Sequence, residues 1–297
     1  MDTAPKVHIP TAYSDQMGRV TQRTPAVRID VSEPTTPNVT RRPDTVAVEE
    51  PMEIRVAGTA LTVTMRTPGD DFDLTLGFLH AEGLIHTSSD VRQLTHCLDE
   101  DESGSPTYNV VDVSLADGVA LPTDRDSRAF LTTSACGVCG KTSIDALHAS
   151  GRYAVREDDT VVDPAILASL PELLRGRQKV FDRTGGIHAA GLFTAAGSLL
   201  VVREDVGRHN AVDKVVGWAI REGRLPLTGH VLVVTSRASF ELTQKAYLAG
   251  IPVLAAVSAP SSLAIQLAQE VGLTLVGFVR APRLTVYSES RRTGIPT

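Results

Sequence analysis

Two cysteines near the middle of the chain are the residues best suited to carry chemistry. They stand in the stretch TTSACGVCGK as Cys136 and Cys139, with a glycine after each, and the chain has only three cysteines. A Cys-x-x-Cys spacing serves three kinds of site: half of a structural zinc site, a redox dithiol, or a reactive thiolate that carries sulfur. A pair of small core residues without a chemical role is the fourth alternative.

A metal site is disfavoured by the lack of further ligands. Structural zinc needs four ligands, and the pair supplies two. The remaining cysteine, Cys97, directly follows His96, and two adjacent side chains rarely point at one ion. Zinc deamination needs His-x-Glu followed by Pro-Cys-x-x-Cys, whereas His188 precedes two alanines and comes after the cysteines. We therefore expect no bound metal.

The redox and sulfur-carrier alternatives both need a thiolate with a lowered pKa. Thioredoxin-like motifs usually hold a bulky residue or proline between the cysteines, and the fold expected below is not that of thioredoxin. A persulfide carrier also needs backbone freedom, which Gly137 and Gly140 allow. Lys141 and a helix N-terminus would supply positive potential. The spacing alone does not say which cysteine carries the sulfur.

Polar side chains cluster again further along the chain. Most of them stand where a predicted strand ends or a predicted helix begins, and helix-start N–H groups favour phosphate. Arginines bind phosphate oxygens through paired N–H groups. Hydrophilic surface turns and a structural histidine are the alternatives. The clusters predict an anionic, phosphate-bearing ligand, with these candidate residues: Arg183, His188, Arg208, His209, Ser236, Arg237, Arg280 and Arg283.

Composition excludes several classes of protein. The 297 residues carry a formal charge of −6, which disfavours a non-specific nucleic-acid binder. No apolar run approaches the roughly 18 residues that a membrane helix needs. The N-terminal stretch lacks the apolar region of a signal peptide. We therefore expect a cytoplasmic protein, without nucleic-acid or membrane partners, whose thiols stay reduced.

The pattern of polar and apolar residues divides the chain into three segments. Residues 1–44 lack sustained periodicity and predict a disordered or tethered arm. Residues 45–128 predict a small α+β domain, with alternating strands within 52–69 and 107–115 and a helix within 70–85. Residues 129–297 predict an α/β domain that holds the Cys-x-x-Cys loop and the ligand site.

The last third of the chain predicts a parallel sheet. A helix over 164–181, a hairpin that turns at Ala196-Gly197 and a helix over 207–223 come first. A βαβαβ series follows, which requires right-handed crossovers and places ligands at the carboxyl ends of the strands. The expected strands span 230–236, 251–259 and 273–280.

Several long blocks, taken in order, resemble the FdhD family of formate dehydrogenase accessory sulfurtransferases. The resemblance covers roughly residues 45–290, and such a series is more specific than one Cys-x-x-Cys. The blocks are TTSACGVCGK, TGGIHAAGLF, REDVGRHNAVDKVVG, SRASFELTQKAYLAGIPVLAAVSAPSSLAIQLA and LTLVGFVR.

The resemblance implies a function. Family members accept sulfur as a persulfide from a cysteine desulfurase. They pass it to the molybdenum or tungsten of a bis(molybdopterin guanine dinucleotide) cofactor, which is cargo and which formate dehydrogenase needs. The resemblance further implies a homodimer and a cytoplasmic location. It also implies a C-terminal three-layer α/β domain similar to the cytidine-deaminase fold.

The resemblance also assigns residues. Cys136 would carry the persulfide, and Cys139 matches the second cysteine of the family's pair. The family's cofactor-binding segment falls on Phe278, Val279, Arg280, Ala281, Pro282 and Arg283. Family members often have glycine after the arginine of this segment, where this chain has Ala281-Pro282.

Three hypotheses remain. The leading one is a sulfurtransferase with a persulfide on Cys136. A non-catalytic chaperone that binds the cofactor and docks it into the dehydrogenase is the alternative from another class. A dithiol redox enzyme is the third, and it predicts a stable Cys136–Cys139 disulfide.

Overall fold

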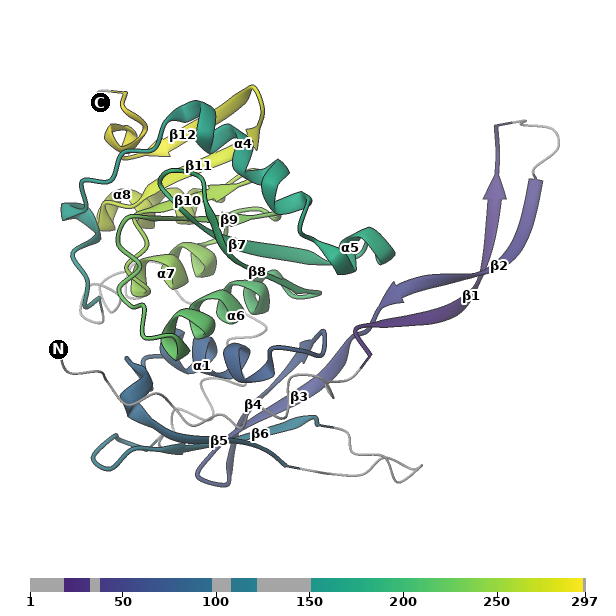
Figure 1. Cartoon of the computed structure of the whole chain (residues 1–297), viewed down its shortest axis with the longest axis horizontal. Coiled ribbons are helices and arrows are strands. Elements are labelled where there is room, and N and C mark those ends of the chain that lie inside the picture. The colour runs from purple at the N-terminus through teal and green to yellow at the C-terminus, as the bar shows by residue number, and fades with distance from the viewer. Residues whose placement is uncertain (1–18, 33–37, 98–107, 122–150, 296–297) are drawn as a thin grey trace.

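Three β-sheets and the helices around them form the described part of the chain (Figure 1). The computed structural model describes residues 19–32, 38–97, 108–121 and 151–295. Both residues of the Cys-x-x-Cys pair and the proposed boundary at 128/129 lie outside these ranges. Short 3₁₀ turns punctuate the fold at Ser88–Asp90, Val155–Glu157 and Ser290–Thr293.

An antiparallel hairpin of β1 (Thr21–Asp30) and β2 (Asn38–Ala47) opens the structure. The two strands pair only with each other, and Figure 1 shows them projecting from the body. Of the two alternatives expected for residues 1–44, a disordered or a tethered arm, the disordered one is wrong for the residues of this hairpin. Its β-branched Val, Ile and Thr residues favour strands, but its prolines interrupt the alternation that reveals a strand in sequence.

The N-terminal unit is a four-stranded sheet covered by one long helix. Its strand order is β4-β3-β6-β5. The expected turn at Ala57-Gly58 is confirmed, as is the expected helix, α1 (Asp71–Ala81). The sequence did not predict β5, in which apolar residues recur irregularly. The strands are β3 (Glu50–Val56), β4 (Thr59–Arg66), β5 (Val91–Cys97) and β6 (Val110–Leu115).

A mixed six-stranded sheet of order β12-β11-β10-β9-β7-β8 forms the second unit. The three expected parallel strands are confirmed, as is the hairpin of β7 and β8. β12 was not predicted and pairs antiparallel with β11. The strands are β7 (His188–Thr194), β8 (Leu199–Asp205), β9 (His230–Val234), β10 (Val253–Ala256), β11 (Thr274–Arg280) and β12 (Arg283–Ser288).

Helices cover both faces of this sheet. Alternate strand residues such as Phe193 and Val233 pack toward α4, whereas Leu192 and Leu232 pack toward α6, α7 and α8. The expected helix over 164–181 is broken after Gly176 into two helices. The helices are α4 (Pro164–Arg175), α5 (Lys179–Thr184), α6 (Arg208–Arg221), α7 (Phe240–Leu248) and α8 (Ser262–Val271).

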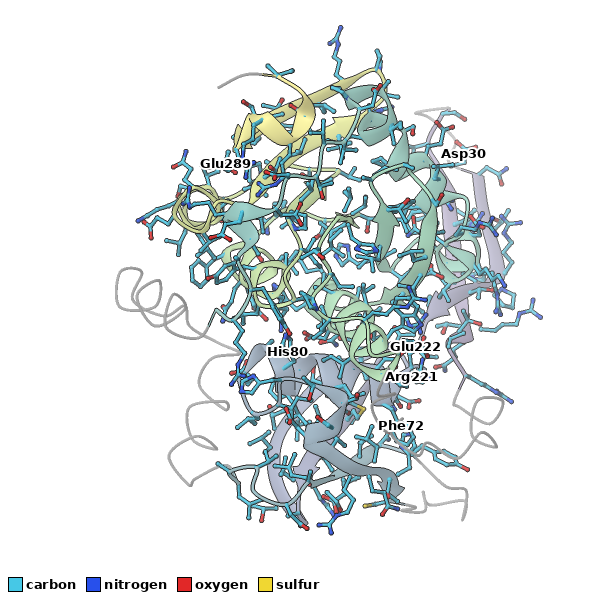
Figure 2. All side chains as sticks on the ribbon, turned by 60° about the vertical axis from the view of Figure 1, so that its left-hand side comes forward. Asp30, Phe72, His80, Arg221, Glu222 and Glu289 are labelled. Carbon is cyan, nitrogen blue, oxygen red and sulfur yellow. The ribbon has the colours of Figure 1, made fainter. Side chains whose placement is uncertain are left out.

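Two glycines let α1 and α6 cross closely between the units. A Cβ on Gly77 would lie 2.0 Å from the carbonyl oxygen of Asp213, and one on Gly217 would lie 1.7 Å from that of Asp73. Figure 2 shows His80 and Arg221 near this junction. One hydrophobic core runs from the four-stranded sheet through α1 and α6 to the six-stranded sheet. The two units are therefore packed as one body.

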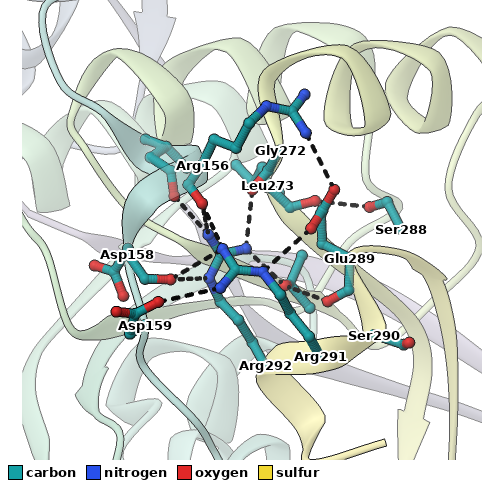
Figure 3. A network of polar contacts seen from close by, with 12 residues as sticks. Arg156, Asp158, Asp159, Gly272, Leu273, Ser288, Glu289, Ser290, Arg291 and Arg292 are labelled. Atoms are coloured by element: carbon teal, nitrogen blue, oxygen red, sulfur yellow. Dashed lines mark hydrogen bonds and ion pairs between the residues drawn. The ribbon is translucent and has the colours of Figure 1, made fainter. Parts of the chain in front are cut away.

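A buried arginine, Arg292, joins the last described turn to two earlier segments through hydrogen bonds (Figure 3). Arg292 is fully buried, and its guanidinium donates to the backbone oxygens of Gly272 and Asp158, each at 2.9 Å, and of Val155 at 2.5 Å. These carbonyls belong to the end of α8 and to the segment before α4. The network thereby closes the sheet edge that carries β12.

Candidate functional site

A cavity of about 860 Å³ opens at the carboxyl ends of the parallel strands. The sequence placed a ligand site at this edge, and the walls come from α4, α5, the glycine turn before β7 and the ends of β9 to β11. Its volume is typical of small-molecule sites. The lining side chains that matter below are Glu172, Arg175, Gln178, Phe181, His188, Thr235, Val257, Val279, Arg280 and Ala281.

Strand register brings distant segments to this edge. β7 runs antiparallel to both of its neighbours, so its first residue lies beside the end of β8 and the end of β9. His188 pairs with Asp205 in this register. The hydroxyl oxygen of Thr235 accepts the Ala189 N–H at 2.9 Å and fixes the turn from β9. The register thus accounts for His188 and Thr235 in one cavity wall.

Cationic side chains line two sides of the cavity. The Arg175 guanidinium lies 4.4 Å from the centre of the Phe181 ring and forms an ion pair with Asp182 at 2.5 Å. Arg280 is exposed at the end of β11 and forms no ion pair with a described residue. Glu172 is the acidic residue of the lining. A mostly apolar cavity with a few convergent polar groups fits an organic anion.

Gln178 is a lining residue that sequence reasoning missed. Gln178 is 2% exposed and stands on the cavity lining. In sequence it is one polar residue in a linker after Gly176, and no spacing distinguishes it from an exposed linker residue.

The start of α6 brings two predicted residues close to His188. Burial, opposed by the charge of Glu241 and assisted by that of Arg208, lowers the pKa of His209 to about 4. Burial likewise lowers the pKa of His188, with Arg208 contributing. Both imidazoles are therefore neutral at neutral pH, and arginines supply the positive charge. The His209 Nε2 lies 3.3 Å from the Ser239 hydroxyl.

Arg208 and His209 do not themselves line the cavity. The Nε atom of Arg208 is buried and has no hydrogen-bond partner among the described residues. His209 instead faces the N-terminus of α7, where its Nε2 lies 3.4 Å from Glu241. Both are near enough to His188 to interact with it electrostatically.

Three other predicted residues lie away from the cavity lining. Arg183 donates to the Thr21 hydroxyl at 2.5 Å, which directs it to the base of the β1–β2 hairpin. Ser236 is buried, and its hydroxyl donates to the Arg237 carbonyl at 3.0 Å. The Arg237 side chain is exposed. The structure therefore does not bring these residues together with His188.

The predicted segment after the last parallel strand is only partly a cavity wall. Val279, Arg280 and Ala281 line it, whereas Phe278, Pro282 and Arg283 do not. Phe278 is 51% exposed and has a positive φ of 51°. The pairing of β11 with β12 is irregular between Gly277 and Arg280, so regular alternation along the strand does not decide which of these neighbours face the cavity.

The charged block at the start of α6 also has a structural role. Lys214 is buried, pairs with Asp205 at 2.8 Å and donates to the Thr67 carbonyl at 2.9 Å. Asn210 donates to Asp205 at 3.1 Å and to the Met65 carbonyl at 2.8 Å. These bonds join α6 to the end of β4, so part of this motif holds the two units together.

Neither a metal cluster nor a membrane helix is found within the described ranges. No group of three His, Cys, Asp or Glu side chains there could hold a metal ion. His96 is buried and stacks on Phe72 at 4.7 Å, while Cys97 is its partly buried neighbour on β5. The described helices are all too short or too polar to cross a bilayer.

Comparison with known proteins identifies the family. A model of the FdhD/NarQ family matches residues 47–294. The chain belongs to the FdhD/NarQ family. A relative named sulfur carrier protein FdhD, from Streptomyces avermitilis, is 54% identical over 280 residues, covering 94% of this chain and 98% of the relative. Another of that name, from Mycolicibacterium paratuberculosis, is 56% identical over 253 residues, covering 85% and 93%.

A solved structure shares the family's architecture. It is described as a formate dehydrogenase accessory protein from Desulfotalea psychrophila, with a TM-score of 0.69 and 26% identity, covering 92% of this chain and 99% of that one. The predicted family resemblance is confirmed, and the mixed α/β class with it. The finer prediction of a cytidine-deaminase-like C-terminal domain stays a prediction. The FdhD/NarQ match spans the cavity but leaves β1 outside.

Proposed function

We propose that this chain is a sulfur carrier that serves formate dehydrogenase. It would accept sulfur from a cysteine desulfurase in the cytoplasm and deliver it to the metal of a bis(molybdopterin guanine dinucleotide) cofactor. The relatives named sulfur carrier protein FdhD support the first half, and the accessory-protein neighbour supports the second. The cavity at the sheet edge is the observation that carries the cargo-binding half.

The chemistry assigned to Cys136 is thiol–persulfide exchange. Its thiolate would attack the terminal sulfur of the desulfurase persulfide, forming a new S–S bond while the desulfurase cysteine leaves as a thiolate. Breakage of the S–S bond on Cys136 would pass the terminal sulfur to the cargo at the sulfane level and return Cys136 to the thiolate. Conversion of that sulfur to a sulfido ligand would take two electrons from a reduced cargo metal. The exchange rate depends on the thiolate fraction and on the leaving group. Cys139, three residues away, would assist or protect the persulfide.

The cavity fits the nucleotide part of such a cargo. Pyrophosphate needs cationic donors, and Arg175 and Arg280 stand on the lining. The ring of Phe181 and the amide of Gln178, both on the lining, provide a flat apolar contact and a polar edge, which together suit a planar base. The helices α7 and α8 start at the same edge with serine caps, Ser239 and Ser261. Their N-terminal N–H groups add positive potential there.

A cofactor chaperone without sulfur transfer is the second candidate. The cavity by itself supports binding, since its described lining contains no cysteine. The two functions differ in what Cys136 does, because a chaperone needs no thiolate. Cofactor binding is common to both.

Intact-protein mass spectrometry tests the sulfur-carrier function. The full chain is incubated with a cysteine desulfurase and cysteine, then weighed before and after cyanide treatment. We expect the mass of one added sulfur atom, removable by cyanide and absent in Cys136→Ala. Cys97→Ala is the matched control, because Cys97 lies in β5 among core strands, and it should load like the wild type.

Activation of formate dehydrogenase separates the candidates. Cys136→Ala should bind the cargo but fail to activate the enzyme. Full activation by this variant would favour the chaperone. A wild-type chain that gains no sulfur would contradict sulfur transfer altogether, and a stable Cys136–Cys139 disulfide would point to the redox alternative.

A further inference from the structure

The mouth of the cavity is marked by the lining residues that stay exposed. Arg175 on α4 and Arg280 on β11 are exposed, whereas Gln178 and Val279 are buried in the wall. Because α4 packs against β11 and β12, the two arginines frame one opening. A cargo that leaves the cavity passes these residues, so the protein that takes the cargo has to approach this part of the surface.

Three further cations surround the mouth without lining the cavity. Arg177 and Lys179 lie on either side of Gln178, where α4 gives way to α5, and Arg283 pairs with Arg280 across the turn from β11 to β12. All three are exposed, and none forms an ion pair with a described residue. Because they stand outside the lining, contact with a cargo inside the cavity does not account for them.

The surroundings of the mouth are basic although the chain as a whole is acidic. These five cations stand with the carboxylates of Glu172 and Asp182, which gives a net charge of +3. The whole chain carries −6, so its other residues carry −9. Complementary charge speeds and orients association. An acidic protein surface is therefore attracted to the mouth and repelled by the rest of the molecule.

An exposed aromatic ring stands beside the arginines. Phe278 is 51% exposed, and its φ of 51° lies in the left-handed region, which a bulky residue rarely adopts. Its N–H donates to the Ser258 carbonyl at 3.2 Å, and the pairing of β11 with β12 is irregular between Gly277 and Arg280. Irregularities of this kind re-aim side chains. The fold thus holds an apolar ring in solvent next to arginines, and aromatic and arginine side chains carry much of the binding energy at protein interfaces.

The ring and the five cations form one surface around the mouth, which we call the rim: Arg175, Arg177, Lys179, Phe278, Arg280 and Arg283. We propose that the rim docks an acidic surface of the enzyme that receives the cargo. The inference rests on the proposed delivery of a cofactor to formate dehydrogenase. The recipient has to reach the opening, whereas a sulfur donor meets a cysteine, and the described lining contains none. Docking at the rim lets the cargo pass between the two proteins without release into water.

Binding of purified, cofactor-free formate dehydrogenase to the full-length protein tests the rim. Biolayer interferometry measures the dissociation constant for the wild type and two variants. Arg177→Glu/Arg283→Glu should raise it about 100-fold, because like charges would face each other across the contact. Phe278→Asn should raise it about 10-fold or more, because the aromatic anchor is lost. Asparagine tolerates a left-handed φ, so this variant removes the ring without straining the backbone.

Matched controls carry the same changes elsewhere. Arg92→Glu/Arg224→Glu reverses two exposed arginines, one on β5 and one after α6. Because α6 leads into β9, Arg224 lies at the amino ends of the parallel strands, away from the mouth. Val63→Asn removes an apolar side chain that is 54% exposed on β4, in the other unit. Both controls should bind the enzyme like the wild type, and circular dichroism with thermal unfolding shows that all variants are folded.

Two further readouts separate failure of the rim from failure of the proposed function. Every variant should bind guanosine diphosphate nearly as well as the wild type, and every variant should gain sulfur from the desulfurase. A wild-type chain that loads sulfur but does not bind the enzyme, or enzyme binding indifferent to both rim variants, would overturn the rim and leave sulfur transfer standing. A wild-type chain that neither gains sulfur nor binds the enzyme would contradict the proposed function as well.

Two other occupants of the rim give distinct results. A second equivalent of guanosine diphosphate that the wild type binds and Arg177→Glu/Arg283→Glu loses would assign the rim to the cargo. An RNA oligonucleotide that binds the rim in place of the enzyme would assign it to nucleic acid. Either result would overturn the proposal. Enzyme binding that weakens with added salt in the wild type and less so in Arg177→Glu/Arg283→Glu would support it, because salt screens the attraction between exposed charges.

Discussion

At the scale of single residues, whether a side chain faces the cavity matters more than its residue type. Arg280 and Arg283 are both exposed arginines around one tight turn and pair in the same register, yet only Arg280 lines the cavity. Gln178, which has no charge, stands on the cavity lining, whereas the predicted Arg237 does not. A cationic cluster in the sequence therefore identifies a region, and only the tertiary structure selects the members that face the cavity.

Arg280→Ala should weaken cargo binding and Arg283→Ala should not. Loss of a charge-assisted hydrogen bond costs about 1.5–3 kcal/mol, or roughly 10–100-fold in affinity. Guanosine diphosphate, the nucleotide part of the proposed cargo, is the probe, and calorimetric titration measures its dissociation constant. Arg283→Ala is the matched control and should stay within about twofold of the wild type. Equal losses in both variants would contradict the assignment of the cavity.

At the scale of elements, the crossing of α1 and α6 holds the molecule together. Each helix contributes one glycine that contacts backbone of the other, and no side chain can fill that space. Buried ion pairs flank the crossing, with Lys245 on Asp213 at 2.8 Å and Arg203 on Asp73 at 2.8 Å. The start of α6, beside His188, is thereby fixed relative to the N-terminal sheet.

Gly217→Ala should therefore destabilise the protein by about 3 kcal/mol or more, because overpacking against backbone forces the helices apart. The new Cβ would lie 1.7 Å from the Asp73 carbonyl oxygen. Urea unfolding followed by circular dichroism measures the loss. Gly176→Ala is the control: Gly176 has a helical φ of −66° and its nearest neighbours would lie 3.7 Å from a Cβ, so stability should stay within about 1 kcal/mol. Similar stability in both variants would show that α1 and α6 can separate without cost.

At the scale of the whole molecule, buried ionisable groups tie stability to pH. Burial lowers the pKa values of His80, His96, His188 and His209, so the unfolded chain binds more protons at these histidines than the native protein below pH 6.5. Burial raises the pKa of Asp213 to about 7, so the native protein binds more protons than the unfolded chain at this carboxyl group. Asp213 therefore favours the folded state at acidic pH, opposite to the histidines. The histidines therefore favour the folded state above pH 6.5 and lose that effect on acidification.

His209→Gln should flatten the acid side of the stability profile. The native pKa of about 4 lies below the ordinary value of 6.5. The contribution of His209 is thus complete above pH 6.5 and lost as the pH falls toward 4. We expect the unfolding free energy of the wild type to fall by about 1–2 kcal/mol more than that of the variant between pH 7 and pH 5. Urea unfolding at both pH values measures this, and parallel profiles would contradict the assigned pKa.

Much of the fold follows from local patterns in the sequence. Buried runs such as 230–236 and 251–259, separated by capped helices, predict the parallel strands and the edge at which a ligand binds. Asp163 caps α4 as expected, accepting the Ala165 N–H at 2.7 Å. β5 was missed because apolar residues recur irregularly along it, and the β1–β2 hairpin was missed because prolines interrupt its alternation.

By itself, the sequence determined the family and the parallel series of β9, β10 and β11, because blocks of residues and hydrophobic periodicity are local properties. The assignment of Cys136 and Cys139 to sulfur chemistry stays a prediction. Only the tertiary structure decided which side chains share the cavity. Register sets His188 beside Thr235, a break after Gly176 turns Gln178 inward, and a turn separates Arg280 from Arg283. The tertiary structure alone also showed that the β1–β2 hairpin projects from the body. Whether its side chains are exposed depends on which other segments pack against it.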